Sequence, residues 1–394
     1  MRIVILSPDY PPKRSGLADH TRHLAEHLRR LGQNEVIVLT TSVSEGGAAV
    51  PTEAQEEDVA GVLVRRVIAH WGWRGFASLA REITRAAPDW LLVPYVPHAY
   101  GRGGVNLAFP LMLVRERLRG RRLLLLVHEL YADLPLFPLR HLSAALAQRA
   151  MFWLAAGAAR GLAVSIEPWT TWLRQAPPIR WTRARIFHLP SPSNIEPVPT
   201  DRERVRRHLG LREEEVVLAF FGTLHVSKKR MWLLRSVEAL SARQIPTRLL
   251  AIGPDSEELL ALAPMKVREK ILAFGYVDAP TVSRLLQASD LFLLPLSDGV
   301  STRRSSLMAA LSHGLPVVGT SGRLTDESLK HSGALLLSPA DDLDAFLRHV
   351  VALAEDAERR RQLGERGRAL YRERYDWPVI AERVLAVLRD LSER

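Results

Sequence analysis

Two adjacent arginines, Arg303 and Arg304, stand where an apolar strand gives way to a helix. The strand is expected at residues 291–296 and the helix at about 305–312. Strand, loop, helix and the following strand form a βαβ unit, in which ligands bind beyond the carboxyl ends of the strands. Because the free N–H groups of a helix N-terminus favour anions, the two arginines predict a phosphate or carboxylate site. The alternative is that both are ordinary solvated loop arginines.

A lysine follows a second apolar run at a comparable position. Lys228 lies in the loop 222–230, after a strand expected at 216–221. Gly222 lets the backbone approach a ligand, and the lysine supplies a point charge for a phosphate. A glycine with a nearby lysine is weak evidence alone, and it gains value because the loop is expected at the same edge as the two arginines. No G-x-x-x-x-G-K-[ST] or G-x-G-x-x-G motif occurs, which argues against a nucleotide hydrolase and a nicotinamide enzyme.

The first half of the chain offers two further candidates. His128 follows the apolar run 123–127, and a histidine at the carboxyl end of such a strand faces the ligand crevice; a structural histidine is the alternative. Gly16 ends the Pro-rich loop 7–16 and opens a helix, so its N–H could meet a phosphate; a Pro-stiffened turn explains it equally well. No second histidine lies at metal-ligand spacing, so we expect no metal.

Strands and helices alternate throughout both halves. Expected strands are 2–6, 35–40, 62–67, 90–94, 123–127, 162–165 and 185–188, then 216–221, 248–252, 271–274 and 291–296. Expected helices include 17–31, 232–241, 259–262, 280–288, 305–312, 342–353, 357–372 and a last one at 375–391, broken by Pro378. Continuous apolar runs are typical of parallel strands buried on both faces. We therefore predict an α/β fold with two Rossmann-like doubly wound parallel-sheet domains facing across a cleft.

The Pro- and Ser-rich residues 189–200 lack periodicity and indicate an interdomain linker. This divides the chain into domains 1–190 and 191–374. The length of 394 residues also favours two domains. The chain has no cysteine, which excludes disulfides, thiolate catalysis and Cys-based zinc sites and fits a reducing compartment. No signal peptide is visible and no apolar run reaches the ~18 residues of a membrane span, so we expect a cytoplasmic protein.

The basic charge is concentrated in the first half. Of the formal net charge of +11, about +8 falls within residues 1–197. No zinc-finger, RNP or recognition-helix signature accompanies it, so nucleic acid is not an expected partner. Two interpretations remain equally good. One is arginine placed on solvated faces, and the other is weak peripheral contact with an anionic membrane, at its inner face.

Taken together, these segments resemble a retaining, metal-independent glycosyltransferase of GT-B fold, in the glycogen-synthase-like group (group 1, family 4) that uses nucleotide sugars. The resemblance covers nearly the whole chain. It rests on RIVILSPDYPPKRSG, LLVHELY, the FG…K loop at 221–228, FGYV at 274–277 and ASDLFLLPLSDG…SLMAALSHGLPVV. The final YDW…IAERVL resembles the segment that crosses back onto the first domain in that fold, which assigns residues 375–394 to the first domain.

The resemblance implies roles for single residues. The lysine matching Lys228 contacts the donor diphosphate in that group, and the histidine matching His128 lies near the donor sugar and the reacting centre. The glycine matching Gly16 approaches the diphosphate or the acceptor. Catalysis would rest on His128 and Lys228, with no cofactor and no metal.

Backbone groups would complete the donor site. Those around Tyr276 and Val277 would contact the base, and those around Arg304 and Ser305 would cap the phosphates. The implied partners are a nucleotide diphosphate sugar as donor and a glycan or lipid-linked acceptor.

Two glutamates typical of that group are missing. They normally stand thirteen and five residues before the glycine matching Gly314, where this chain has Ser301 and Ala309. The first glutamate normally holds a hydroxyl of the donor sugar and the second the ribose hydroxyls. Because alanine cannot accept a hydrogen bond, ribose recognition must move elsewhere or weaken.

A third departure concerns charge. The group tends to have an arginine directly after the glycine matching Gly222, and this chain has Thr223. We hypothesise that Arg303 or Arg304 replaces that charge.

Three functions follow as hypotheses. The first is transfer of a sugar from a nucleotide diphosphate sugar to a hydroxyl acceptor, with retention, in glycan or glycolipid synthesis. The second is a catalytically silent, glycosyltransferase-like binding or scaffold protein that has lost normal donor recognition. The third, a GT-B epimerase or phosphorylase, predicts turnover without an acceptor or with free phosphate.

Overall fold

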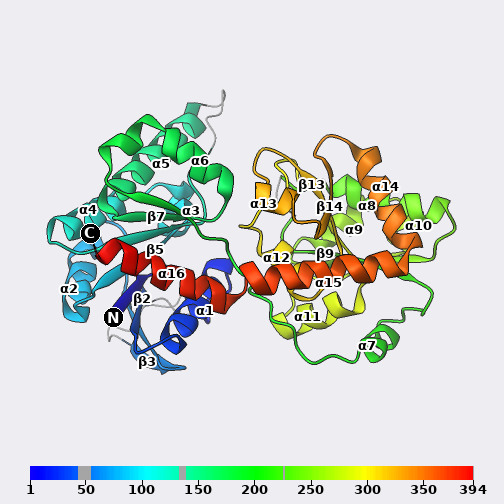
Figure 1. Cartoon of the computed structure of the whole chain (residues 1–394), viewed down its shortest axis with the longest axis horizontal. Helices are drawn as coiled ribbons and strands as arrows, with labels where there is room; N and C mark the ends of the chain where they lie inside the picture. Colours follow the sequence, from blue (N-terminus) through cyan, green and yellow to red (C-terminus); the bar gives the residue numbers. More distant parts are fainter. Residues whose placement is uncertain (43–54, 133–138, 225–226, 394) are drawn as a thin grey trace. The chain divides into compact units, whose positions relative to one another are not determined.

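A computed structural model describes residues 1–42, 55–132, 139–224 and 227–393. Residues 225–226 of the predicted 222–230 loop lie outside this part of the chain. The structure divides into two compact units. Unit 1 comprises Met1–Pro190 together with Trp377–Arg394, and unit 2 comprises Ser191–Asp376. Each unit is a twisted sheet packed between helices (Figure 1).

Unit 1 contains an eight-stranded sheet in the order β3-β4-β2-β1-β5-β6-β7-β8. Its strands are β1 (Arg2–Leu6), β2 (Glu35–Thr41), β3 (Gln55–Val59), β4 (Val62–Ile68), β5 (Trp90–Tyr95), β6 (Leu123–Val127), β7 (Gly161–Val164) and β8 (Arg185–His188). Neighbouring strands run parallel except β3, which pairs antiparallel with β4. The sequence did not predict β3 because its polar residues QEEDV lack an apolar face, as is common at a sheet edge.

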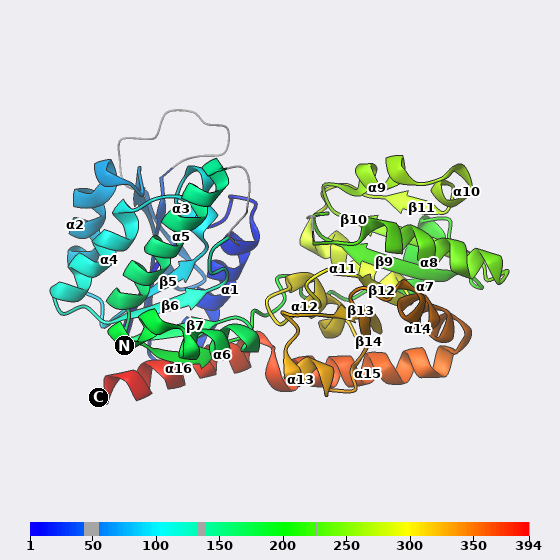
Figure 2. The same ribbon diagram turned by 90° about the horizontal axis from the view of Figure 1, so that it is seen from above.

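Helices cover both faces of this sheet (Figure 2). Along β1, Val4 and Leu6 pack in the core beneath α2 (Phe76–Ala86), α4 (Ala108–Leu118) and α5 (Leu139–Ala158), whereas Ile3 and Ile5 pack in a second core. That second core lies under α1 (Gly16–Arg30) and α16 (Trp377–Ser392). The remaining helical segments are η1 (Trp73–Gly75), α3 (Pro97–Tyr100), η2 (Arg102–Gly104), α6 (Glu167–Gln175) and η3 (Pro177–Trp181). The continuous apolar strands are therefore buried on both faces, as predicted.

Unit 2 contains a six-stranded parallel sheet in the order β11-β10-β9-β12-β13-β14. Its strands are β9 (Val216–Phe221), β10 (Thr247–Ile252), β11 (Ile271–Ala273), β12 (Leu291–Leu294), β13 (Val317–Ser321) and β14 (Leu335–Pro339). Its helices are α7 (Arg202–His208), α8 (Arg230–Ala242), α9 (Ser256–Leu262), α10 (Met265–Arg268), α11 (Ala279–Ala288), α12 (Ser305–Ser312), α13 (Glu327–Lys330), α14 (Leu343–Glu355) and α15 (Ala357–Arg374). The strand order reverses between β9 and β12, which is where such sheets bind ligands. The predicted Rossmann-like sheets are confirmed in both units.

One sequence prediction needs correction. The last helix is not broken by Pro378, because α16 begins at Trp377 and the proline stands in its first turn, where no N–H is needed. The two units divide at Pro190 and Ser191, within the Pro- and Ser-rich segment 189–200. Ser191 donates its N–H to the carbonyl of Thr302 (3.0 Å) and Val198 donates to Ser283 Oγ (3.0 Å), which fixes the segment to unit 2. No helix in the described part of the chain is both long enough and apolar enough to cross a bilayer.

Candidate functional site in unit 2

The loops that follow β9 and β12 are joined by backbone pairing. Lys228 and Leu296 form an antiparallel bridge. Lys229 donates its N–H to the Pro295 carbonyl (2.9 Å), and Ser297 donates to the carbonyl of Ser227 (2.7 Å). The structure thereby brings the predicted lysine loop and the predicted arginine loop together at the carboxyl edge of the sheet, between the two strands where its order reverses.

Lys228 is a buried lysine, 9% exposed. Its Nζ donates to the carbonyl of Phe221 (3.3 Å) and lies 4.4 Å from the centre of the Phe220 ring. Burial, and then the positive charge of Arg304, lower the pKa of Lys228 to about 7, while Asp255 acts in the opposite direction. The ammonium form is therefore only partly populated near neutral pH, and a bound anion would favour it.

Gly222, six residues before Lys228, lies next to the ammonium group of this lysine. Gly222 adopts φ +105°, and a Cβ there would stand 3.2 Å from Lys228 Nζ. Thr223 follows as an exposed residue, and the N–H of Leu224 is held by Asp255 Oδ2 (2.7 Å). A glycine thus keeps the space beside the ammonium group open.

Both arginines of the second loop contact one carboxylate. Arg304 Nη2 lies 2.9 and 3.2 Å from the two oxygens of Asp298 and 3.4 Å from Ser227 Oγ. Arg303 Nη2 lies 3.3 Å from Asp298 Oδ2. Sequence reasoning missed this role of Asp298, although an acid five and six residues before two arginines in one short loop was a usable signal. With Lys228, the cluster holds three basic side chains. Asp298 contacts the two arginines, and the charge of Asp255 acts on Lys228.

Buried hydrogen bonds fix the shape of the arginine loop. Asp326 is fully buried and accepts from Thr302 N (2.7 Å) and Thr302 Oγ1 (3.0 Å). Gly299 has φ +84°, and a Cβ there would meet Thr325 Oγ1 at 2.1 Å. The predicted helix is confirmed: α12 starts at Ser305, and its N-cap residue Arg304 gives no side-chain cap. The first N–H groups of α12 therefore follow directly on the two arginines.

The two positions that lack the expected glutamates lie inside the protein. Ser301 is 0% exposed, and its Oγ has no hydrogen-bond partner within the described residues. Ala309 is also 0% exposed and packs in the apolar core beneath α12. Neither position presents a polar side chain to solvent.

The predicted base-contact residues come from a different strand. Tyr276 is 61% exposed and Val277 half-buried; both follow β11, which is separated from β9 by β10. The strand ends are linked stepwise, because Gly222 donates to the Ile252 carbonyl (2.8 Å) and Gly253 to the Gly275 carbonyl (2.9 Å).

In unit 1, Gly16 is the first residue of α1, as predicted. The N-cap Ser15 accepts from Ala18 N (3.0 Å) and donates to Asp9 Oδ2 (2.7 Å). Asp9 is buried and also pairs with Lys13. A carboxylate is therefore already present beside the N-terminus of this helix.

His128 follows β6, and its N–H is held by the Tyr95 carbonyl (3.1 Å). Its ring meets the ring of His20 edge-on, with 4.4 Å between the centroids. Burial lowers the pKa of His128 to about 4. The pKa of His20 is also lowered, by burial and then by the charges of His128 and His23. Both imidazoles are therefore neutral at physiological pH.

Among the described residues, no group of three or more His, Cys, Asp or Glu side chains is arranged to hold a metal ion.

Comparison with known proteins bears on unit 2 most directly. Residues 215–356 match the family model described as glycosyl transferases group 1. The matched segment lies within unit 2 and is similar to that family. It includes β9, Lys228, the arginine loop and α12, so the basic cluster lies within the matched segment.

A curated relative is similar to a longer stretch of the chain. A GDP-mannose-dependent monoacylated alpha-(1-6)-phosphatidylinositol monomannoside mannosyltransferase from Corynebacterium glutamicum is 24% identical over 213 residues, which are 51% of this chain and 55% of the relative. The chain spans about half the length of the curated relatives it matches, 44–55%.

Solved structures match the fold over the whole chain. Sucrose-phosphate synthase from Thermosynechococcus elongatus aligns with a TM-score of 0.73 at 16% identity, covering 100% of this chain and 99% of the other. Anabaena HepE in complex with UDP-glucose aligns with a TM-score of 0.65 at 15% identity, covering 99% and 100%. These likenesses support the GT-B type of fold.

Proposed function

We propose that this chain is a glycosyltransferase that moves a sugar from a nucleotide diphosphate sugar to a hydroxyl acceptor in glycan or glycolipid synthesis, with retention and without a metal. The similarity of residues 215–356 to the group 1 glycosyl transferases supports the reaction class. A GDP-mannose-dependent relative and a UDP-glucose-bound structural neighbour support the donor class.

The observation that carries the proposal is the basic cluster of Lys228, Arg303 and Arg304 in front of α12. The two loops that bear it are tied together by backbone hydrogen bonds, so the cations are positioned before a ligand arrives. Preorganised cations beside a helix N-terminus suit the two phosphates of a nucleotide diphosphate.

In the proposed reaction, the bond between the anomeric carbon and the diphosphate oxygen breaks. The acceptor oxygen bonds to that carbon, and its proton passes to the departing diphosphate oxygen. Lys228 and the arginines stabilise the negative charge on the leaving diphosphate. His128, neutral at physiological pH, is proposed to lie near the donor sugar and to position it. The proposed reaction has no covalent intermediate, because none of the residues assigned to it is a carboxylate that could serve as the nucleophile of a double displacement.

Turnover with a panel of UDP-, GDP- and ADP-sugars tests the proposal, with hydroxyl acceptors of glycan and glycolipid type. We expect release of the nucleoside diphosphate with one donor class, unchanged by EDTA, and proton NMR of the product should show the anomeric configuration of the donor. Lys228→Met should reduce turnover by at least about a hundredfold. Turnover that persists in this variant, or inverts the anomeric centre, would contradict the proposed reaction.

The second candidate is a catalytically silent binding protein. The observation in its favour is that Ser301 and Ala309 are buried and offer no carboxylate for the sugar or the ribose. A thermal-shift panel of nucleoside diphosphates separates the two functions, because a ligand at a hundred times its Kd stabilises by about 2.7 kcal/mol. Silence across the panel would favour the binding protein.

We also propose a peripheral membrane contact through unit 1. Leu107, Leu111 and Leu118 of the α4 region are 42%, 38% and 83% exposed and recur at helical spacing. Trp73, 67% exposed, stacks on Phe76 at 6.2 Å. These side chains, together with exposed arginines at 74, 81, 85 and 119, suit an anionic bilayer.

Vesicle co-sedimentation tests this contact. Binding to vesicles with 30% phosphatidylglycerol should fall several-fold in a Leu111→Glu, Leu118→Glu variant and be weak on phosphatidylcholine alone. Leu146→Glu, at a leucine of α5 that is 52% exposed, is the matched control and should bind like the parent protein. An equal loss of vesicle binding in both variants would exclude the α4 surface as the membrane contact.

A further inference from the structure

A second basic site lies on unit 2, away from the donor cluster. A cavity of about 880 Å³ opens between α7 and α11. Its wall, as the described residues form it, includes neither Lys228 nor the arginines of the loop before α12. Pockets of this volume are typical of small-molecule sites.

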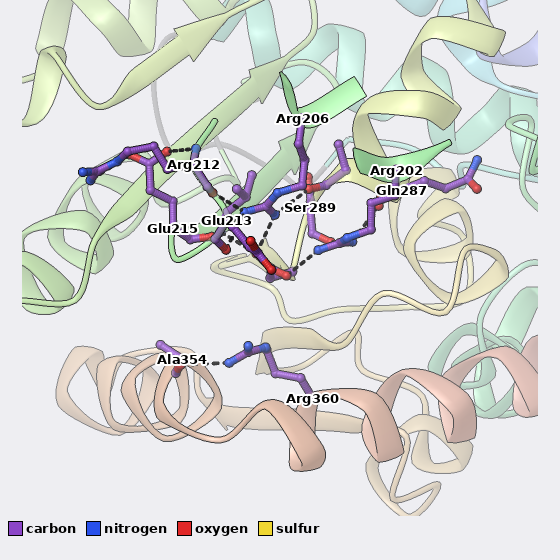
Figure 3. Close-up of polar contacts among 12 residues, drawn as sticks. Arg202, Arg206, Arg212, Glu213, Glu215, Gln287, Ser289, Ala354 and Arg360 are labelled. Carbon is purple, nitrogen blue, oxygen red and sulfur yellow. Dashed lines mark hydrogen bonds and ion pairs between the residues drawn. The ribbon is translucent and has the colours of Figure 1, made fainter. Parts of the chain in front are cut away.

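The helix that forms one wall is short but firmly anchored. On one face of α7, Arg206 is buried and donates to the carbonyls of Glu215 (2.7 Å), Arg212 (3.0 Å) and Ala288 (3.1 Å). Arg202 donates to the carbonyls of Gln287 (2.7 Å) and Ser289 (2.8 Å), as Figure 3 shows. Both arginines also pair with Asp290. An isolated helix of seven residues would not be stable. The hydrogen bonds and ion pairs of Arg202 and Arg206 therefore fix α7 in place and determine where the side chains on its opposite face lie.

That opposite face presents cations to the cavity. Arg204 and Arg207 line it from α7, and Arg284 lines it from α11. All three are exposed, and none of their guanidinium groups makes a hydrogen bond or ion pair within the described part of the chain. The acid in the wall, Asp201, caps α7 by accepting from Arg204 N (3.0 Å). Positive charge therefore exceeds negative charge in the wall.

The floor of the cavity is apolar. Phe274 and Leu209 are half-buried there, and Leu285 is 3% exposed. Arginines around an apolar floor fit a ligand with a phosphate group on a ring or hydrocarbon body, because guanidinium groups bind phosphate oxygens in a planar, paired geometry.

We propose that this cavity binds a phosphate-bearing small molecule with an apolar or aromatic body, at a site separate from the nucleotide sugar. Phosphate would bind between Arg204 and Arg284, and the ring would pack on Phe274. The site does not depend on the proposed sugar transfer, because no residue assigned to the donor lines it.

Isothermal titration with phenyl phosphate at low ionic strength tests the site on the full chain. Phenyl phosphate should bind at least about threefold more tightly than inorganic phosphate, because only the former reaches the apolar floor. Arg204→Gln with Arg284→Gln should weaken phenyl phosphate binding by at least about tenfold. Arg366→Gln removes an exposed arginine of α15 and should change it less than about twofold.

The donor cluster is the competing binding place and needs its own control. A variant with Lys228→Met and Arg304→Ala should bind phenyl phosphate like the parent protein. Loss of binding in that variant, or unchanged binding when Arg204 and Arg284 are replaced, would overturn the proposal. Failure of the parent protein to bind at millimolar concentration would overturn it as well, whatever the outcome of the sugar-transfer assays.

Discussion

Lys228 is a residue whose charge depends on pH near neutrality. Its pKa of about 7 in the free protein results mainly from burial, and a diphosphate placed beside it would raise that value again. Binding of a diphosphate above neutral pH must therefore take up a proton at this lysine.

We predict that the affinity for the preferred nucleoside diphosphate falls by up to about tenfold per pH unit between pH 8 and 9.5. Well below pH 7 the lysine is already charged, whereas within this window the proton must be acquired from solvent. Titration calorimetry in two buffers of different ionisation enthalpy should show uptake of close to one proton at pH 8.5. Lys228→Met should remove the slope, and a slope that survives would assign it to another group.

Protonation of Lys228 should also make the free energy of unfolding of unit 2 depend on pH: stability should rise with pH, whereas ligand affinity falls. The folded pKa lies below the unfolded value of 10.5, so between these values the unfolded chain binds the extra proton, and unfolding free energy rises with pH. We predict that unit 2 is less stable at pH 6 than at pH 9 and that Lys228→Met gains about 2–4 kcal/mol at pH 6. Denaturant unfolding of both proteins at the two pH values measures this. Parallel pH profiles would contradict it.

Arg304 and Arg303 are neighbours, but replacing each should affect the pH dependence of nucleoside diphosphate binding differently. Both contact Asp298, and Arg304 in addition lies 3.4 Å from Ser227 Oγ and lowers the pKa of Lys228. We predict that either alanine variant weakens nucleoside diphosphate binding, and that Arg304→Ala also moves the pH midpoint of binding upward. Affinity measured across pH for both variants tests this, and unchanged affinity in both would refute the replacement of the lost charge.

At the scale of elements, the sequence predicted most of what places the donor cluster. The strand at 216–221 and the helix at 305–312 were predicted with the bounds that β9 and α12 have, because an unbroken apolar run and a turn before a helix are local signals. Pairing between side chains distant in sequence was not predictable. The contacts of Asp326 with Thr302 and of Arg206 with Asp290 depend on how strands and loops are brought together, and single-residue types do not encode that arrangement.

The arginine loop depends on Gly299. Alanine at this position would face a left-handed backbone and a clash, since its Cβ would stand 2.3 Å from Gly322 N. Gly333 is the matched control in unit 2, with φ +63° and open space around it. We predict that Gly299→Ala costs at least about 2 kcal/mol more than Gly333→Ala and also weakens nucleoside diphosphate binding. Thermal unfolding and titration measure both, and equal losses would show that only backbone strain acts.

At the scale of the molecule, unit 1 depends on α16. Trp377 is 2% exposed and packs against His20 (5.0 Å between ring centroids) and His23 (5.2 Å). We predict that Trp377→Ala destabilises unit 1 by about 3–5 kcal/mol while unit 2 is unaffected. Calorimetry that resolves the two transitions tests this. Trp181→Ala, at a side chain that is 85% exposed, should leave both transitions in place.

The position of α16 in the chain has a consequence for synthesis. The apolar face of the unit 1 sheet that α16 covers includes Ile3, Leu92 and Leu124, which leave the ribosome long before Trp377 does. All of unit 2 is translated in between. Unit 2 can therefore complete its core while the sheet of unit 1 still lacks α16 on one face. Unit 2, although second in the sequence, is the first unit that can finish folding. Unit 1 needs protection from aggregation until α16 emerges from the ribosome.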